Sequence, residues 1–326
     1  MIRALAVVGG LAVLAAGLLF PWIKTPAIVG LCYALAALGV GVLMRAGQVS
    51  FGHAMYACIA AYTVAFVARA FPGTDALLLL VIGTAAALLA GAVVGLFVVR
   101  YREIFFGMLN LALSMVLFSL LGKFYGVTGG TDGLRIDRPA LAGIVFERAG
   151  FETALLVLTL GLAVVLGWFV QRYYSSAAGE ALAGVKTNET RLEYLGLSTR
   201  LILWKGYLLS AGLCGLAGAL TALLQGLVTP ESGYWLRSGE FVFIAILGGA
   251  GHAFGAFIGA FVFEVIKLVA AAYLTGIWQL LLGVTLIVVI IAAPAGLTGL
   301  LLRRRAAARP PESAARPQPQ ALGGEG

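Results

Sequence analysis

Repeated apolar runs are the feature that most limits what this chain can fold into. Short polar segments divide most of its 326 residues into such runs, and the mean hydropathy is +1.02. An apolar helix of about 20 residues crosses the hydrocarbon core of a bilayer. Helices are the expected form because the backbone must satisfy its own polar groups in lipid, and the short alternating segments of a transmembrane barrel are absent from the sequence. We predict an all-α, polytopic helical bundle in a lipid bilayer.

About ten spans are predicted from the lengths of these runs. Their limits are 4–20, 27–45, 50–69, 76–99, 104–122, 153–171, 203–227, 240–250, 253–273 and 277–301. The eighth run is too short for a full crossing, so a broken or re-entrant helix is expected there, ending in the glycine-rich stretch 248–251. The first run resembles the core of a signal peptide, but no convincing cleavage site follows it, and we interpret it as a span.

The distribution of basic residues predicts the orientation. With ten spans, both termini and segment 172–202 share one side, and that side carries a two-to-one excess of Lys and Arg. Such an excess marks the cytoplasmic side, which leaves 123–152 as the main external loop. The net charge of +8 is spread between spans and over the tail, so it indicates topology rather than a nucleic-acid partner. Residues 1–302 are expected to form the membrane domain, and the Pro-, Gln- and Ala-rich tail 303–326 is expected to be disordered.

Enzyme motifs are missing from the sequence. It has no phosphate-binding Gly-x-x-x-x-Gly-Lys-Ser/Thr loop, its two histidines form no metal-ligand cluster, and its three cysteines lie inside apolar runs. We therefore expect no cofactor and no catalysis by this chain. An active transporter of this kind would take its energy from a partner ATPase or from an ion gradient. Glu264 and Lys267 are the main ionisable pair at membrane depth, and a structural pair is favoured over a proton relay.

Two glycine-rich polar segments are candidates for a translocation path. The first opens the third run and contains Gln48, Ser50 and His53, and the second contains Gly249 and His252. Aligned from Gly52 and from Gly251, the two segments share several residues, which suggests an internal repeat or a chance match in a Gly/Ala-rich chain. The histidines are interpreted mainly as hydrogen-bonding residues between helices, with ligand contact as the alternative.

One charged segment between spans is predicted to form two short helices, near Ala177–Lys186 and Arg191–Leu195, with a solvated loop as the alternative. Thr190 and Glu193 have the spacing of a capping box, and Gly196 is a plausible helix stop. A compact, mixed-charge segment in an otherwise apolar chain is expected to contact a soluble partner.

Seven blocks of sequence together resemble the permease subunits of branched-chain amino acid ABC importers, of the type with the longer external loop. The first four are Gly47-Gln-Val-Ser-Phe-Gly-His-Ala54, Phe106-Gly-Met-Leu-Asn-Leu-Ala112, Thr128-Gly-Gly-Thr-Asp-Gly-Leu134 and Gly179 to Leu197. The others are Leu209 to Leu220, Leu247-Gly-Gly-Ala-Gly251 and Pro294-Ala-Gly-Leu297. They occur in order over about residues 30–302, so the resemblance covers most of the chain.

The resemblance implies a subunit of an ATP-driven importer in the bacterial cytoplasmic (inner) membrane. Its partners would be a second, homologous permease, cytoplasmic ATP-binding subunits and an external solute-binding protein. The residues implied to dock the ATPase are Glu180, Lys186, Glu189, Arg191 and Gly196. Those implied to line the path are Gln48, Ser50, His53, Asn110, Gly249 and His252, and those implied to dock the binding protein are Asp132 and Arg135. The segment departs from the general importer loop Glu-Ala-Ala-x-x-x-Gly at Leu182 and Lys186.

The substrate is expected to be a branched-chain or related amino acid. Importers that this chain resembles also serve urea, short amides, and aromatic or dicarboxylic acids, so these stay as alternatives. A self-sufficient, ion-coupled carrier is the alternative of a different class, and a membrane scaffold without transport is a third.

Overall fold

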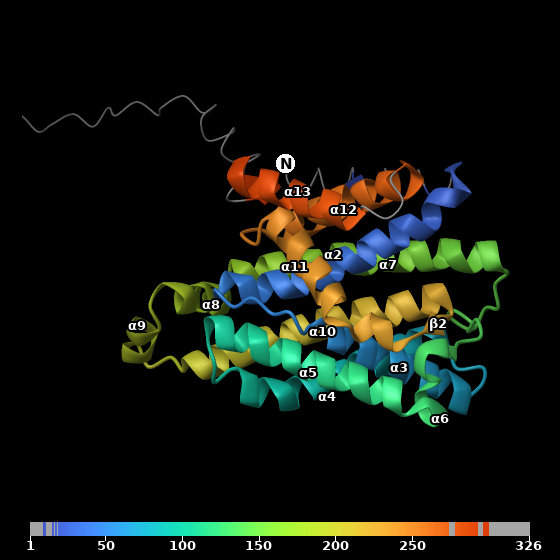
Figure 1. Cartoon of the computed structure of the whole chain (residues 1–326), viewed down its shortest axis with the longest axis horizontal. Coiled ribbons are helices and arrows are strands. Elements are labelled where there is room, and N and C mark those ends of the chain that lie inside the picture. Colours follow the sequence, from blue (N-terminus) through green and yellow to red (C-terminus); the bar gives the residue numbers. More distant parts are fainter. Residues whose placement is uncertain are drawn as a thin grey trace, which may run out of the picture.

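Figure 1 shows the computed structural model of the chain, which describes residues 19–273, 278–292 and 296–299 together with positions 9, 10, 15 and 17. The predicted first span and the tail 303–326 therefore lie almost entirely outside the described residues. Within them the architecture is all-α apart from one pair of two-residue strands. The long helices are α2 (Lys24–Arg45), α3 (Ala54–Ala70), α4 (Ala76–Val98), α5 (Glu103–Lys123), α7 (Arg148–Tyr174), α10 (Thr199–Gln225), α11 (Trp235–Gly248), α12 (Ala253–Tyr273) and α13 (Trp278–Ala292).

Shorter elements connect these helices. They are the 3₁₀ turns η1 (Pro21–Ile23), η2 (Gly130–Asp132) and η3 (Pro230–Gly233), the short helices α6 (Tyr125–Thr128), α8 (Ala177–Thr187) and α9 (Glu189–Tyr194), and the strands β1 (Leu134–Arg135) and β2 (Leu227–Val228). Six helices of the described chain are long and apolar enough to cross a membrane, and α3 is a shorter apolar helix. The described residues thus confirm a polytopic helical chain, whereas the count of ten spans remains a prediction.

Several predicted limits of the spans are wrong, including the start of α10, which is Thr199 rather than residue 203. The third helix begins at Ala54 rather than at residue 50, because Gly47 has a positive φ of 76° and residues 46–53 run as a non-helical segment. The eighth begins at Trp235 rather than at 240, directly after η3. Helix α7 begins at Arg148, more than a turn before the predicted residue 153. Polar residues continue each of the last two helices beyond the apolar run that hydropathy detects.

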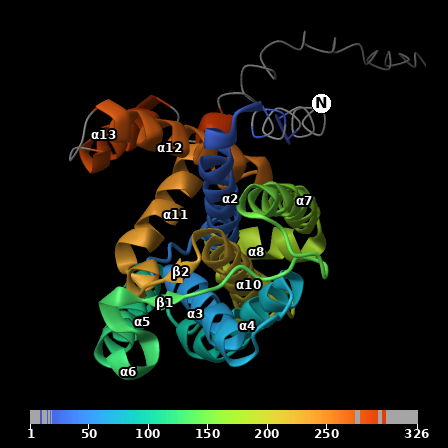
Figure 2. The same ribbon diagram turned by 90° about the vertical axis from the view of Figure 1, so that its right-hand side faces the viewer.

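Helices α2 and α10 lie at the centre of the bundle, as the end-on view in Figure 2 shows. The most apolar windows of these two helices are 72% and 67% buried, against 28% for α4, 22% for α5 and 33% for α7. Small residues allow the close packing. A Cβ on Gly39 of α2 would lie 2.8 Å from the Ser210 carbonyl oxygen of α10. The outer helices keep apolar faces exposed, as helices in contact with lipid do.

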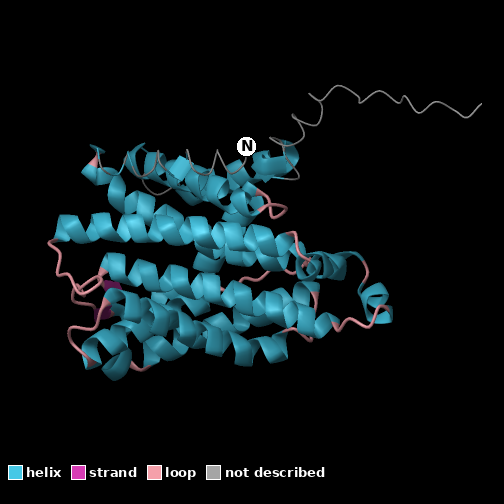
Figure 3. Ribbon diagram, turned by 180° about the vertical axis from the view of Figure 1, so that it is seen from behind, coloured by secondary structure: helices cyan, strands magenta, loops and turns pink. Residues whose placement is uncertain are grey.

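The polar segments gather at the two opposite ends of the bundle. Helices α8 and α9 project from one end, while α6, β1 and β2 lie at the other (Figures 1 and 3). The predicted separation of segment 172–202 from loop 123–152 is therefore present in the fold. Strand β1 pairs antiparallel with β2, so loop 123–152 is tied to the segment that follows α10.

The glycine-rich break after α11 is confirmed, and another part of the chain covers it. Gly249 has a φ of 92°, and the hydroxyl of Thr298 donates a 2.6 Å hydrogen bond to the Gly248 carbonyl oxygen. A Cβ on Gly296 would lie 2.5 Å from the Gly249 backbone. With 14 residues, α11 is about 21 Å long, which is short for a bilayer of about 30 Å.

Candidate transport site

A buried polar junction forms where the irregular segment 46–53 meets α3, α5 and α10. Ser50, His53 and Asn110 are all fully buried there. The Ser50 hydroxyl and His53 Nδ1 are 2.5 Å apart, and the Ser238 hydroxyl of α11 accepts a 2.8 Å hydrogen bond from the Ala54 amide that opens α3. Three of the residues predicted for the translocation path are thus brought into one place.

Two tyrosines extend this junction into a hydrogen-bonded chain. Tyr207 of α10 donates to Asn110 Oδ1 at 2.5 Å, and its hydroxyl is 2.7 Å from that of Tyr56 in α3. The His53 ring packs edge-on against both tyrosine rings. Sequence analysis missed Tyr56 and Tyr207 because an aromatic residue in an apolar run looks like ordinary core. Only the fold places their hydroxyls together.

His53 is only partly satisfied inside the chain. Its Nδ1 has the Ser50 contact, whereas its Nε2 is buried without a hydrogen-bond partner among the described residues. The Ser50 contact lies within segment 46–53, so no hydrogen bond of His53 among the described residues links two helices, and its interpretation as a hydrogen-bonding residue between helices stays a prediction. A buried polar atom without a partner is uncommon in native structures.

Close backbone packing holds the junction together. A Cβ on Gly52 would lie 2.1 Å from the Asn110 carbonyl oxygen, so only glycine fits between the segment and α5. Gln48, the third predicted path residue of this segment, accepts a 2.8 Å hydrogen bond from the Glu103 amide at the start of α5. Gln48 therefore fixes the segment to α5 instead of standing free.

The second predicted path segment lies elsewhere. Gly249 and His252 line a small pocket of about 10 Å³ together with Leu38 of α2 and Tyr174 of α7. Both α3 and α12 begin at the alanine that follows the histidine, but His53 is fully buried whereas His252 is partly exposed. The two segments share a helix start and differ in their surroundings, so an internal repeat stays a prediction.

The two predicted helices of the charged segment are present as α8 and α9, but the predicted capping box is wrong. Asn188 is the N-cap of α9, and its side chain accepts a 3.0 Å hydrogen bond from the Arg191 amide. Glu193 instead accepts from the Thr199 hydroxyl at the start of α10. The stop at Gly196 is confirmed, because its φ is 78° and the Leu197 amide donates back to Leu192.

Several residues predicted to dock an ATPase contact the membrane helices of their own chain. Glu180 pairs with Arg45 at the end of α2 at 3.1 Å, and Glu189 accepts two hydrogen bonds from Arg102 at 2.6 and 3.2 Å. The Lys186 side chain packs beside Gly47. Arg191 and Gly196 are exposed. These contacts fix α8 and α9 to the ends of α2 and α5.

The outer tip of the segment carries exposed apolar side chains that sequence analysis missed. Tyr194 is 88% and Leu195 is 69% exposed, and Leu197 is 41% exposed. Side chains of this size in water commonly mark a contact with another protein. Their signal in the sequence was the run Tyr194-Leu-Gly-Leu197, interrupted by the helix stop.

The opposite end is built on glycines with positive φ. A Cβ on Gly133 would lie 2.4 Å from the Val228 carbonyl oxygen, and one on Gly129 would lie 2.3 Å from that of Gly133. This turn holds Asp132 and Arg135 exposed. Asp132 accepts a hydrogen bond from the Tyr125 hydroxyl, which raises the pKa of Tyr125. Arg135 lies in β1 beside β2.

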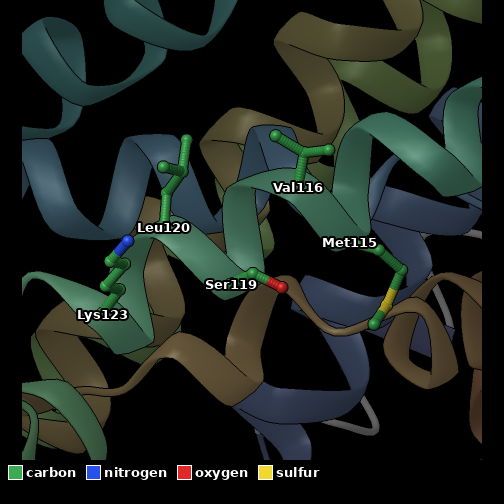
Figure 4. A pocket seen from close by; sticks show the side chains of 5 residues that line it. All are labelled: Met115, Val116, Ser119, Leu120 and Lys123. Atoms are coloured by element: carbon green, nitrogen blue, oxygen red, sulfur yellow. The ribbon is translucent and has the colours of Figure 1, made fainter.

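Helix α5 also carries a shallow surface depression, shown in Figure 4. Its lining residues, Met115, Val116, Ser119, Leu120 and Lys123, all belong to α5 itself. A depression formed by one helix has no opposing wall, so nothing in it points to a particular ligand.

The family model described as "Branched-chain amino acid transport system / permease component" matches residues 22–291 of the chain. This match covers the junction, the charged segment and both ends of the bundle. The chain belongs to the branched-chain amino acid transport permease family. As a permease component it is a transport subunit and not an enzyme.

Individual relatives agree with this assignment. The permease is 29% identical over 287 residues to the high-affinity branched-chain amino acid transport system permease protein LivM of Escherichia coli K12. The aligned region covers 81% of this chain and 67% of LivM. The permease is 25% identical to the probable branched-chain amino acid transport permease protein LivH of Methanocaldococcus jannaschii, over 82% of this chain and 88% of LivH. The high-affinity branched-chain amino acid transport system permease protein LivH of Escherichia coli K12 is likewise 25% identical, over 83% of this chain and 92% of LivH. No solved structure matches the permease.

Proposed function

We propose that the permease forms the translocation path of an ATP-driven importer together with a second, homologous permease, and that the path carries branched-chain or related amino acids. An external binding protein would deliver the amino acid to the β1–β2 end, and ATP-binding subunits would dock on α8 and α9. Both termini and α8–α9 would be cytoplasmic, in the bacterial inner membrane. The proposal takes its substrate class from the family match and from the names of the relatives.

The observation that carries the proposal is the placement of two exposed surfaces at opposite ends of one packed bundle. Exposed Tyr194 and Leu195 project at the end formed by α8–α9, and exposed Asp132 and Arg135 lie at the other end. α10 connects them directly, because it begins three residues after Gly196 and ends next to β2. A force on α9 therefore reaches the external loop through a single helix and the β1–β2 pair.

The proposal refines which residues contact the ATPase. Because Glu180 and Glu189 are paired with Arg45 and Arg102, we assign them to holding α8 and α9 on the bundle. We assign contact with the ATPase to the exposed Arg191, Tyr194 and Leu195, with Lys186, Gly196 and the 68% exposed side chain of Glu180 beside them. Polar neighbours around an apolar anchor are typical of the centre of a protein interface.

Affinity purification from native membranes tests the proposal. An ATP-binding subunit and a second permease should co-purify, and the complex in proteoliposomes should take up leucine only with internal ATP and the external binding protein. The variant Tyr194→Ala/Leu195→Ala should lose the ATPase while keeping the second permease, because it alters only exposed side chains. Ile144→Ala/Val145→Ala, which also alters two neighbouring exposed apolar side chains but at the other end, is the matched control. Leucine uptake driven by an ion gradient without ATP would contradict the proposal and favour a carrier.

A further inference from the structure

A mixed-charge cluster lies around Tyr33, away from the buried junction. It comprises Tyr33 of α2, Arg237 and Glu240 of α11, and Glu264 and Lys267 of α12 (hereafter the Tyr33 cluster). Arg237 donates to the Tyr33 hydroxyl and pairs with Glu240 at 3.1 Å, both through Nη1. Lys267 Nζ lies 3.5 Å from the Tyr33 hydroxyl and 5.1 Å from the centre of its ring. Arg237 belongs to the first turn of α11.

The Tyr33 cluster lies at membrane depth. Arg45, at the far end of α2, is paired with α8, so α2 enters from the opposite end, and Tyr33 is nine residues, or about 14 Å, along it. Helix α11 is flanked by α12–α13 on one side and by α5–α6 on the other in Figure 2. Ionisable side chains at such depth are found facing protein or a water-filled space, not hydrocarbon.

The Tyr33 cluster is open on one side. Tyr33 itself is only 6% exposed, whereas the side chain of Arg237 is 35% exposed, and Glu264 and Lys267 are half-buried. One carboxylate oxygen of Glu264, Oε1, is buried without a hydrogen-bond partner among the described residues. Two cations and two carboxylates thus meet at a partly open surface with hydrogen-bonding capacity left over.

The chemistry of the Tyr33 cluster matches the two charged ends of a zwitterion. A guanidinium group binds a carboxylate well, and a carboxylate with an unused oxygen accepts from an ammonium group. The Tyr33 ring packs against Phe241 and Phe263 at 5.8 and 5.9 Å, and all three rings are buried, so they hold the charged groups in place and offer no surface to a ligand side chain. The carboxylate and the ammonium group of an α-amino acid therefore both have a partner here.

Resting on the proposed function, we propose that the Tyr33 cluster is a transient binding site for the charged ends of the transported α-amino acid. Arg237 contacts its carboxylate and Glu264 its ammonium group. The open side faces the water-filled path between this chain and the second permease. The site binds the amino acid weakly, because its charged side chains also pair with one another. When the amino acid leaves, these pairs form again and no ion is left unpaired.

Transport by the assembled importer tests this site. At saturating leucine-loaded binding protein, Arg237→Gln and Glu264→Gln should each lower leucine uptake per ATP hydrolysed about tenfold, the loss expected when one charge-assisted hydrogen bond is removed. Glu231→Gln, an exposed acid in η3, is the matched control and should behave as wild type. Unchanged uptake per ATP in both variants would overturn the site. If the wild type shows no ATP-dependent leucine uptake, the proposed function fails instead.

A second measurement covers variants that fail to assemble. The background for this measurement is a chain with Cys32, Cys58 and Cys214 replaced by alanine. In it, Phe261→Cys reports on the face of α12 one turn before Glu264, and Val93→Cys reports on α4. The native side chains at these two positions are 65% and 72% exposed. A membrane-impermeant thiol reagent should label Phe261→Cys in the assembled importer, and excess leucine-loaded binding protein should slow it, whereas Val93→Cys should stay unlabelled in lipid. Equal reactivity at both positions, or none at Phe261→Cys, would overturn the proposal.

Discussion

Single residues in this permease are constrained most strongly where backbones touch. Gly52 illustrates this, because the space that a side chain would need is occupied by the Asn110 backbone at 2.1 Å, and backbone cannot move aside as a side chain tip can. The same contact brings Asn110 to Tyr207 and keeps the hydrogen-bonded chain in place. A hydropathy profile treats Gly52 as a neutral position in an apolar run and gives no sign of this role.

Gly52→Ala should destabilise the permease by about 1–3 kcal/mol, the usual range for overpacking a well-packed core. The loss should appear as a lower unfolding temperature of the purified chain in detergent. Gly122→Ala near the end of α5 is the matched control, since a Cβ there meets nothing within 4 Å and alanine favours a helix over glycine, so it should not lower the transition. Equal stability of the two variants would show that the segment shifts to accept a methyl group.

Individual contacts over long sequence separations could not be predicted. Arg45 and Glu180 are 135 residues apart, and Arg102 and Glu189 are 87 apart, so no local pattern links them. The family resemblance implied that Glu180 and Glu189 dock an ATPase, and that role stays a prediction. Their ion pairs could not be foreseen, because each glutamate finds an arginine of its own chain only once the helices pack.

At the scale of elements, helix type and approximate position followed from the sequence, but helix ends did not. Long apolar runs identified α2, α4, α5, α7, α10 and α12, because a helix that crosses a bilayer needs about 20 apolar residues. The starts of α3 and α11 were missed, since a positive φ at Gly47 and the turn η3 act through backbone geometry that hydropathy does not record. The cap of α9 was misassigned because Asn188 and Thr190 both have side chains suited to capping.

The ion pair between Arg102 and Glu189 should couple α9 to the start of α5. Its side chains are only 25% and 34% exposed, so a double-mutant cycle with Arg102→Ala and Glu189→Ala should give a coupling energy of about 0.5–1 kcal/mol. The coupling should shrink in high salt, because the pair is partly solvated. A coupling of zero at low salt would mean that other contacts alone, such as the packing of Leu192 on Gly184, position α9.

At the scale of the whole molecule, the fold places two distinct surfaces at opposite ends of a bundle centred on α2 and α10. The sequence predicted this separation through its alternating runs and its basic residues. It could not predict that loop 123–152 would be tied to η3 and α11 through β1 and β2, because two-residue strands leave no detectable pattern. Nor could it show that Arg237 joins Tyr33 and Glu240 within the bundle.

Opposite sidedness of the two ends can be measured directly. The native cysteines are buried, so the wild-type chain should give little background with an impermeant thiol reagent. Tyr194→Cys should be labelled only from the cytoplasmic side and Val145→Cys only from outside, at positions 88% and 85% exposed in the structure. Labelling of both from the same side would contradict the proposed topology, and reversal of the two would invert it.

The covered break at Gly248 and Gly249 has a consequence for biogenesis. The hydroxyl that bonds to Gly248 belongs to Thr298, 50 residues further along the chain, with α12 and α13 in between. A ribosome must therefore release almost the whole membrane domain before the turn between α11 and α12 is closed. Until then, α11 has a finished N-terminal side, anchored through Ser238 to α3, and an open C-terminal side. Thr298, which follows α13, thus closes the turn between α11 and α12 that was translated well before it.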